Sequence, residues 1–430
     1  MDRKDMLRDP LVWKFRMYGF LKNLRFFEPY MLLYLIGAGL SLFQIGLLFS
    51  LREAVIYVFE IPSGVLADHW GRKKELLLCF VFYLISFALF FIGRSLPIFA
   101  GAVTFFGLGE AFRSGTHKAM IYTYLDHHGV ADEKTFLYGR TRAWSLLGSA
   151  LSALIAVPLA LGLPAYRWLF VVAMLPYIGD LALIWSYPDW LDRDENMVEE
   201  KSERGFLSFG FRSLRSVMRD RRLMRALLSS SIYDGLFKII KDYVQPILAL
   251  VLVGTLAGDG DKALTVWLGL TYCIFHLAGS AASASIWRLR RRISSAWLMN
   301  ASFDVMGMAA LLLAGVSLWG SPLTVAAVFF LLYVMKDARR PIFVDLCGDL
   351  MDRDVRATVM SVDSQLRSFL AVIAAPLLGW VADGTGLPVA FAMVGLFMLA
   401  SNRWLKVQSR EIAVIPEIES SEGGRKKSEE

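Results

Sequence analysis

The chain has few cysteines, and their positions suggest no paired or metal-binding role. Its 430 residues include three cysteines, Cys79, Cys273 and Cys347, which lie far apart inside apolar runs. We therefore expect neither a disulfide framework nor a metal site. The first sixteen residues are basic and lack the small-residue cleavage site of a signal peptide. No nucleotide-binding motif is present in the sequence, so we expect no ATP hydrolysis and no cofactor.

Charged residues are also scarce, and apolar residues are unusually frequent. Charged residues make up 20% of the chain and hydrophobic residues 56%, whereas soluble domains are about 45–50% apolar. Many apolar runs are long enough to cross roughly 30 Å of hydrocarbon as a helix. The net charge of +7 would suit a nucleic-acid binder, but the basic residues lie between apolar runs, where membrane topology requires them. We therefore expect a protein of the lipid bilayer with no nucleic-acid partner.

The apolar runs predict twelve membrane-spanning helices. They cover about residues 20–40, 42–67, 76–92, 97–124, 144–161 and 168–187, and then 223–253, 263–287, 294–318, 322–346, 357–382 and 387–406. Residues 126–142 are expected to form a polar loop. An even number of spans places both termini on one side of the membrane. The loops on that side carry most of the arginines and lysines, while the opposite loops carry only Arg94, Arg167 and Lys262, so both termini are predicted to be cytoplasmic.

A long polar segment, residues 189–222, divides the chain. We expect a six-helix bundle over residues 1–188, a cytoplasmic linker over 189–222 and a second bundle over 223–407. Within the linker, Leu207, Phe211, Leu214 and Met218 recur at helical spacing opposite arginines, which predicts a basic amphipathic helix on the inner membrane surface. The charged tail over residues 408–430 is expected to be disordered.

The most specific motif lies between the second and third predicted spans. It reads Gly-Val-Leu-Ala-Asp-His-Trp-Gly-Arg-Lys over residues 64–73. This resembles the signature loop of the major facilitator superfamily, Gly-x-Leu-Ala-Asp-x-x-Gly-Arg-Lys, except that His69 stands where that family more often has Arg or Lys. The resemblance implies an all-helical fold of two six-helix repeats and a secondary transporter rather than an enzyme. We expect a monomer in the bacterial cytoplasmic (inner) membrane.

Two pairs of residues at corresponding positions support the repeat. Glu110 precedes Arg113 by three residues in the fourth span, and Asp337 precedes Arg340 by three residues in the tenth. Such matches favour parallel repeats related by an axis along the membrane normal.

Polar residues at membrane depth are costly, so they indicate a functional site. The resemblance implies that spans one, four, seven and ten line the central cavity. The candidates for solute binding are Arg113, Lys238, Arg340, Arg339, Tyr34 and Gln245. Buried carboxyls can hold a proton near neutral pH, and the candidates for the coupling proton are Glu28, Glu53, Glu60, Glu110 and Asp234. Asp68, Arg72 and Lys73 of the signature loop, with Arg142, are expected to gate the cytoplasmic side.

A structural role is the alternative for the charged residues that lie three or four apart. Arg25–Glu28, Glu110–Arg113, Asp337–Arg340 and Asp363–Arg367 have the spacing of ion pairs within one helix. Glu53 and Glu60 have no base at that spacing, so their partners should come from other spans. Arg52 is adjacent to Glu53 and is expected to point about 100° away from it.

These residues favour proton-coupled symport of a small polar solute that is charged, either anionic or zwitterionic. One alternative is a proton-driven exporter of drugs or metabolites, although the fifth span lacks the Gly-Pro pair that is common in drug antiporters of the superfamily. Another is a transporter-like sensor that binds its ligand without moving it.

Overall fold

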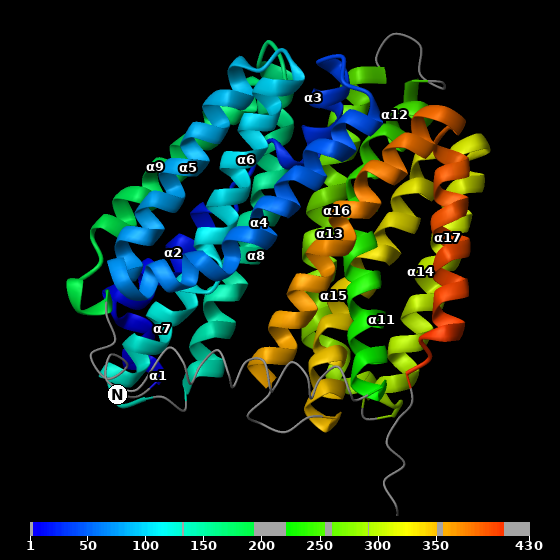
Figure 1. The fold of residues 1–430 in the computed structure, drawn as a ribbon. Helices are drawn as coiled ribbons and strands as arrows, with labels where there is room; N and C mark the ends of the chain where they lie inside the picture. Colours follow the sequence, from blue (N-terminus) through cyan, green and yellow to red (C-terminus); the bar gives the residue numbers. More distant parts are fainter. Residues whose placement is uncertain are drawn as a thin grey trace, which may run out of the picture.

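The computed structural model describes residues 3–130, 133–192, 221–253, 260–290, 292–350 and 356–407, and all regular secondary structure in these ranges is helical. Figure 1 shows the helices as two bundles side by side, with α2 to α9 in one and α11 to α17 in the other. The N-terminus and the last helix, α17, end on the same side of the molecule, as expected for an even number of spans.

The first bundle contains the helices formed by residues 3–192. These are α1 (Arg3–Arg8), α2 (Pro10–Leu21), η1 (Glu28–Tyr30), α3 (Met31–Gly37), α4 (Leu42–Trp70), α5 (Arg72–Ile92), α6 (Leu96–Arg113), α7 (Thr116–His127), α8 (Lys134–Gly162), α9 (Trp168–Trp185) and η3 (Asp189–Leu191).

The second bundle contains the helices formed by residues 221–404. These are α11 (Arg221–Ile240), η5 (Lys241–Tyr243), α12 (Val244–Val253), α13 (Gly260–Arg290), α14 (Ser295–Trp319), α15 (Pro322–Leu350), α16 (Arg356–Thr385) and α17 (Leu387–Trp404).

Eight helices in the described part of the chain are long and apolar enough to cross a membrane on their own. They are α4, α5, α8, α9, α13, α14, α16 and α17. The predicted spans one, four, seven and ten are absent from this set. Three of them are interrupted, and the tenth, α15, is continuous but carries charged residues in its interior. The exceptions are therefore the four spans for which the resemblance implies a cavity-lining role.

The first predicted span differs most from its expected form. It was expected as one run over residues 20–40, but α2 already begins at Pro10, where the Asp9 side chain accepts a hydrogen bond from the Leu11 backbone N–H (2.7 Å). The helix then ends at Leu21, and helical structure resumes only at Glu28. Proline at N1 and an aspartate at the N-cap are strong start signals, so the helix begins ten residues before the predicted apolar run.

The fourth span is also broken, between α6 and α7. Gly115 lies at the break with a φ of +84°, a backbone conformation that favours glycine. The predicted polar loop over residues 126–142 is shorter than expected, because α8 begins at Lys134 and extends the fifth span toward the predicted cytoplasmic side.

The two bundles meet along α4 and α16 and along α8 and α13. A Cβ atom on Gly46 would lie 2.4 Å from the carbonyl oxygen of Ala375, so the α4 and α16 backbones approach closely there. At the adjacent helix ends, the Asp383 carboxylate accepts hydrogen bonds from the backbone N–H groups of Leu42 (2.9 Å) and Phe43 (2.8 Å). These are N–H groups of the first turn of α4, which has no intrahelical acceptor for them. The bundles are thus joined at the ends that face away from the predicted cytoplasm.

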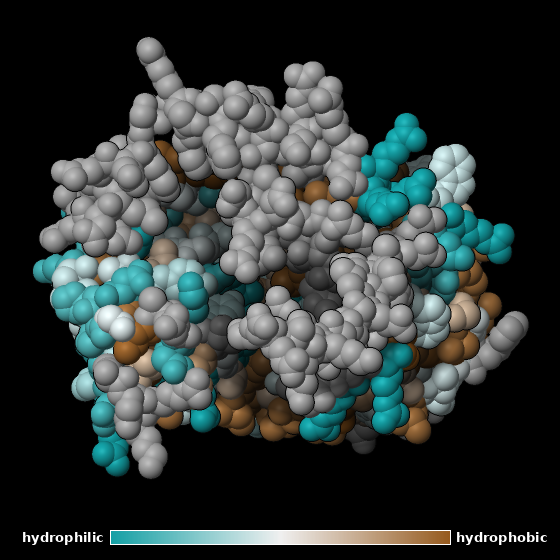
Figure 2. All heavy atoms as spheres, turned by 90° about the horizontal axis from the view of Figure 1, so that it is seen from below, coloured by the Kyte–Doolittle hydropathy of each residue, from teal (hydrophilic) through white to brown (hydrophobic). Residues whose placement is uncertain are grey.

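Figure 2 shows the opposite face, the one at the bottom of Figure 1. Hydrophilic side chains gather on it among the described residues, and hydrophobic side chains appear toward its edge. This distribution suits helix ends that leave the membrane. The predicted amphipathic helix over residues 207–218 and the tail over residues 408–430 lie outside the described residues.

Candidate functional site

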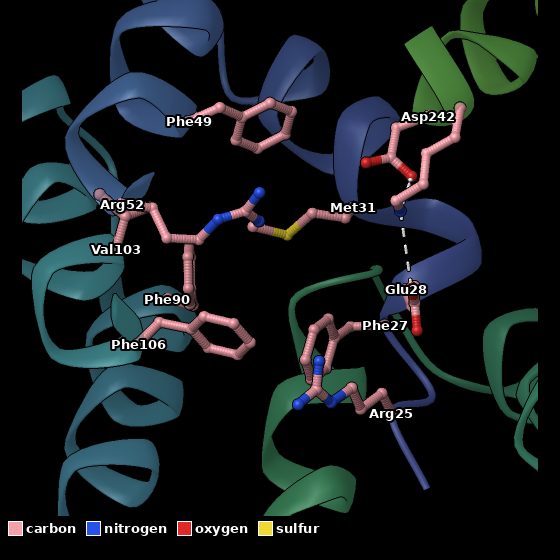
Figure 3. Close-up of a pocket in the computed structure, with 11 residues that line it drawn as sticks. Arg25, Phe27, Glu28, Met31, Phe49, Arg52, Phe90, Val103, Phe106 and Asp242 are labelled. Atoms are coloured by element: carbon pink, nitrogen blue, oxygen red, sulfur yellow. Dashed lines mark hydrogen bonds and ion pairs between the residues drawn. The ribbon is translucent and has the colours of Figure 1, made fainter. Parts of the chain in front are cut away.

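A cavity lies between the two bundles, near the interruptions of the first and seventh spans (Figure 3). The space along its lining, including the part that is open to solvent, is about 540 Å³. Its lining combines charged and apolar side chains: Arg25, Phe27, Glu28, Met31, Phe49, Arg52, Phe90, Val103, Phe106, Lys241 and Asp242.

Gln245 joins the two interruptions. Its Oε1 accepts hydrogen bonds from the backbone N–H groups of Leu32 (2.8 Å) and Leu33 (3.3 Å) at the start of α3. Its Nε2 donates to the carbonyl oxygen of Glu28 (3.1 Å) and to the hydroxyl of Tyr272 (3.1 Å). The side chain is fully buried, and both ends of its amide are occupied by protein groups. Gln245, predicted to bind solute, therefore lies where it positions the cavity walls.

One end of the cavity is rich in acids. Lys241 Nζ lies 3.6 Å from Glu28 Oε1 and 2.6 Å from Asp242 Oδ1, and the hydroxyl of Tyr272 donates to Asp242 (3.3 Å). Figure 3 shows Glu28, from the first span, facing the η5 segment that carries Asp242. At this end two carboxylates share a single ammonium.

The opposite wall is basic. The Arg52 guanidinium reaches from α4 into the cavity toward Met31 (Figure 3) and lies 5.0 Å from the centre of the Phe49 ring. Arg52 Nη2 is also 3.1 Å from Glu53 Oε1, and Lys238 from the second bundle donates to Glu53 as well. The expectation that Arg52 points away from Glu53 was wrong, because its long side chain folds back toward the adjacent carboxylate. The expectation that Glu53 finds a partner on another span is confirmed.

A second shared carboxylate, that of Glu110, lies beside the cavity. Glu110 Oε1 accepts from Arg25 Nη2 (2.5 Å) and from the hydroxyl of Tyr83 (2.9 Å), while its Oε2 accepts from Arg113 Nη2 (2.5 Å). The Glu110–Arg113 pair has the spacing expected from the sequence. The expected Arg25–Glu28 pair does not form, because the chain between α2 and η1 is not helical and a separation of three residues no longer brings side chains together.

A third charge cluster lies in the second bundle. The Asp363 carboxylate, fully buried, accepts from Arg340 (2.7 Å) and from Arg367 (3.2 Å), and Arg367 also lies 3.5 Å from Asp234. The predicted Asp363–Arg367 pair is therefore confirmed. The predicted Asp337–Arg340 pair is not formed, because Arg340 instead forms an ion pair with Asp363 of α16. Asp337 instead accepts from its neighbour Lys336 (2.8 Å).

Arg339 lies inside the second bundle rather than at the cavity. It is 2% exposed, donates to the Ser229 hydroxyl (2.8 Å) and places its guanidinium 4.1 Å from the centre of the Tyr233 ring. The helical turn that directs Arg340 toward Asp363 directs Arg339 to a different face. Arg339, predicted to bind solute, thus contacts only protein groups in the described part of the chain.

Of the residues predicted to bind solute or a proton, only Glu28 lines the cavity. Tyr34 donates to the carbonyl oxygen of Phe90, and Glu60 accepts from the hydroxyl of Ser114 (2.9 Å). The cavity residues absent from those predictions are Arg25, Arg52, Lys241 and Asp242, together with Met31, Val103 and the aromatic side chains. The four charged residues could have been predicted from the sequence, because charge at membrane depth is rare. The aromatic residues could not, because they resemble any other side chains embedded in lipid.

The signature loop packs against its own bundle. Arg72 Nη1 donates to the Thr123 hydroxyl (2.6 Å), and Lys73 Nζ donates to the carbonyl oxygen of Tyr187 (2.7 Å) and to Asp189 (2.8 Å). Arg142 is exposed, and the side chain of Asp68 lies outside the described part of the structure.

Comparisons with known proteins agree with this fold. A family model described as Major Facilitator Superfamily matches residues 23–373. The Bacillus subtilis (strain 168) protein "Uncharacterized MFS-type transporter YxaM" is 24% identical over 383 residues, which cover 87% of this chain and 89% of that protein. "Inner membrane transport protein YajR" of Escherichia coli (strain K12) is 24% identical over 414 residues, which cover 93% and 81% of the two chains.

Solved structures of two transporters have the same fold. The crystal structure of the nucleoside transporter NupG superposes with a TM-score of 0.75 at 11% identity, covering 92% of this chain and 98% of NupG. A POT family transporter in complex with 5-aminolevulinic acid superposes with a TM-score of 0.71 at 14% identity, covering 92% and 95%. At such identities the likeness shows the fold alone.

Proposed function

The chain belongs to the Major Facilitator Superfamily, and we propose that it carries a small anionic or zwitterionic solute through the cavity between its two bundles. It is a multi-pass membrane protein and a secondary transporter rather than an enzyme. The proposal rests on the unequal numbers of acidic and basic side chains at the two ends of the cavity.

The basic side of the cavity favours an anionic group. Glu110 is shared by Arg25 and Arg113, and Glu53 is shared by Arg52 and Lys238. Two carboxylates thus face four bases, so a carboxylate or phosphate of the solute would find positive charge that the protein does not neutralise. Arginine suits this role because its planar fork binds such groups with two hydrogen bonds.

The acidic end of the cavity has the opposite balance, since Glu28 and Asp242 share only Lys241. An ammonium group of the solute would be stabilised there. Between the two ends, Phe27, Phe49, Phe90 and Phe106 provide an apolar wall for the body of the solute. A zwitterion with its charges at opposite ends fits this arrangement best.

Proton-coupled symport is the mode of coupling that we propose. Glu53 is 1% exposed and lies between Arg52 of one bundle and Lys238 of the other. Protonation of Glu53 would remove a charge pair that joins the bundles, which would make their separation depend on proton binding. Glu28 is a candidate for the same reason, because it pairs with Lys241 of the other bundle. Glu110 is a further candidate beside the cavity, although its bases, Arg25 and Arg113, belong to its own bundle.

We further propose a monomer in the bacterial cytoplasmic (inner) membrane, in which residues 1–188 and 223–407 move against each other about the linker 189–222. The relative YajR, whose name places it in the inner membrane, supports this location. The two bundles seen in Figure 1 support the division of the chain.

A thermal-shift screen of the purified protein tests the solute class, because a ligand that binds only the folded state raises its melting temperature. We expect amino acids or organic acids to stabilise the protein and neutral sugars to leave it unchanged. Uptake by proteoliposomes, with and without a pH gradient, then distinguishes symport from export. Stabilisation without any movement of solute would indicate a sensor and contradict transport.

Arg52→Ala is expected to raise the KM for the solute by roughly tenfold to a hundredfold, because a hydrogen bond to a charged group contributes about 1.5–3 kcal/mol. Arg94→Ala is the matched control, since Arg94 is exposed and is not one of the residues that line the cavity. Initial uptake rates over a range of solute concentrations measure the effect. An unchanged KM in Arg52→Ala would place the solute elsewhere.

Asp68→Asn is expected to lower the transport rate about tenfold without reducing the amount of folded protein. The reason is that a carboxylate at this loop can bind a helix N-terminus or an arginine when the cytoplasmic side closes, while Arg72 and Lys73 already hold the loop to its own bundle. Rates are compared at matched protein levels. A wild-type rate would contradict a gating role for Asp68, Arg72, Lys73 and Arg142.

A further inference from the structure

Asp180 is a fully buried acid that does not line the cavity and takes no part in the proposed solute site. It lies in α9 with 0% of its surface exposed, and neither carboxylate oxygen accepts a hydrogen bond from any described residue. An ionised carboxylate in such a place costs several kcal/mol unless a partner neutralises it. The residue therefore requires either a proton or a cation.

The available cation is Lys22, which directly follows α2. Lys22 is close enough to Asp180 for an electrostatic interaction, yet no ion pair of its ammonium occurs among the described residues. Its Nζ lies 5.4 Å from the centre of the Tyr18 ring, and the Tyr18 hydroxyl is itself buried without a hydrogen-bond partner. The acid and the base are thus neighbours that are not in contact.

Other titratable groups extend from this pair toward the cytoplasmic end of the bundle. The His117 ring stacks on Tyr18 with centroids 3.7 Å apart, and its Nε2 is 3.2 Å from the hydroxyl of Tyr187. Tyr187 interacts electrostatically with Asp180 and follows the last turn of α9. None of these side chains is hydrogen-bonded to Asp180, but His117 and Tyr187 together provide a polar path toward the end of α9.

The helices packed against α9 also carry charge at its cytoplasmic end, where Lys14 of α2 donates to the carbonyl oxygen of Ser186 (2.8 Å) and Lys73 of α5 donates to that of Tyr187 (2.7 Å). From α5, Cys79 interacts electrostatically with Lys22 and donates to the carbonyl oxygen of Gly109 (3.1 Å), and Tyr83 donates to Glu110. The part of α8 from residue 143 to residue 162 contains no acid or base. Among these bases, Lys22 is the one that interacts electrostatically with Asp180.

Asp180 is also connected to the cavity. Tyr177 lies one helical turn before it on α9, donates to the Lys22 carbonyl oxygen (3.0 Å) and accepts from Arg25 Nε (3.0 Å). Arg25 lines the cavity, and Lys22 begins the interruption that carries Arg25 and Glu28. A movement of Lys22 would consequently displace a wall of the cavity.

We propose that Asp180 is a proton-binding site of the transport cycle, in which a protonated Asp180 alternates with an Asp180–Lys22 ion pair. When the carboxyl O–H bond breaks, the proton leaves along the His117–Tyr187 path to cytoplasmic water, and the carboxylate attracts the Lys22 ammonium. That movement shifts the interruption of the first span. The inference rests on the proposed proton-coupled function, because it assigns to that function a carboxyl outside the cavity.

Infrared spectroscopy of the protein in lipid nanodiscs detects the carbonyl stretch of a protonated carboxyl while the pH is varied. We expect a band that titrates in wild type, is lost in Asp180→Asn and is kept in the control Asp261→Asn, because Asp261 is exposed. A band unchanged in Asp180→Asn would overturn the proposal. If that variant fails to fold, Lys22→Gln provides the test: the band should persist to more alkaline pH, and an unchanged titration would overturn the proposal.

Transport measurements separate this inference from the proposed function. Proteoliposomes are supplied with a panel of amino acids and organic acids, and exchange without a pH gradient is compared with accumulation driven by one. Asp180→Asn is expected to retain exchange within about twofold and to lose accumulation. Accumulation equal to wild type would exclude Asp180 from coupling. If wild type moves no panel member, the proposed function fails, while the infrared titration still decides whether Asp180 binds a proton.

Discussion

Replacement of Gly46 by valine is expected to lower transport at least tenfold, because it prevents the two bundles from closing between α4 and α16. A Cβ on Gly46 would lie 2.4 Å from the carbonyl oxygen of Ala375, and on the facing helix a Cβ on Gly379 would lie 2.2 Å from that of Leu42. Both obstacles are backbone atoms, which cannot rotate away. Overpacking of this kind costs roughly 1–3 kcal/mol or more, which shifts the balance between states by about fivefold to 150-fold or more.

A cysteine reporter in the cavity measures this closure. Met31→Cys, in a protein without its native cysteines, places a thiol in the lining of the cavity. A membrane-impermeant maleimide added from outside should label it faster in Gly46→Val than in the parent. Gly315→Val is the control, since a Cβ there would meet nothing within 4 Å. Unchanged labelling and transport in Gly46→Val would show that this contact is not a gate.

Replacement of Glu110 by glutamine is expected to destabilise the protein by about 3–5 kcal/mol, because it leaves charged groups buried without a counter-charge. Glu110 accepts hydrogen bonds from Arg25, Arg113 and Tyr83. Transport should fall with stability, since Arg25 lines the cavity. Denaturant unfolding in detergent measures the loss. Asp189→Asn is the control: its carboxylate also binds a lysine, Lys73, but is exposed, and exposed pairs contribute little to stability.

The double variant Glu110→Arg with Arg113→Glu tests whether the pair acts alone. An isolated pair would be restored by exchanging its charges. In this structure the exchange places an arginine next to Arg25, whose guanidinium lies 2.5 Å from the position of the Glu110 carboxylate. We therefore expect the doubly substituted protein to remain destabilised and inactive. Full recovery of stability and transport would show that Arg25 is not part of the interaction between Glu110 and Arg113.

The sequence by itself determined the family and the membrane-spanning segments. A helix needs about 20 apolar residues to cross the hydrocarbon, so long apolar runs predict spans without knowledge of their neighbours. The signature loop over residues 64–73 predicted the superfamily, which the family match over residues 23–373 confirmed. Charges at membrane depth, together with the family resemblance, predicted a cavity lined by the first, fourth, seventh and tenth spans. The first, fourth and seventh spans do line it, whereas the second and third spans take the place expected for the tenth among the described lining residues.

Only the tertiary structure decided where the helices break and which charges meet. The interrupted first span is held by hydrogen bonds to Gln245, which is more than 200 residues away from Glu28 in the sequence. Because these breaks change the direction of the side chains, Arg25 binds Glu110 instead of Glu28. Arg340 binds Asp363 from a neighbouring helix for a similar reason. Spacing along one helix predicts only local pairs, whereas a buried charge is stabilised by whichever opposite charge lies nearest in space.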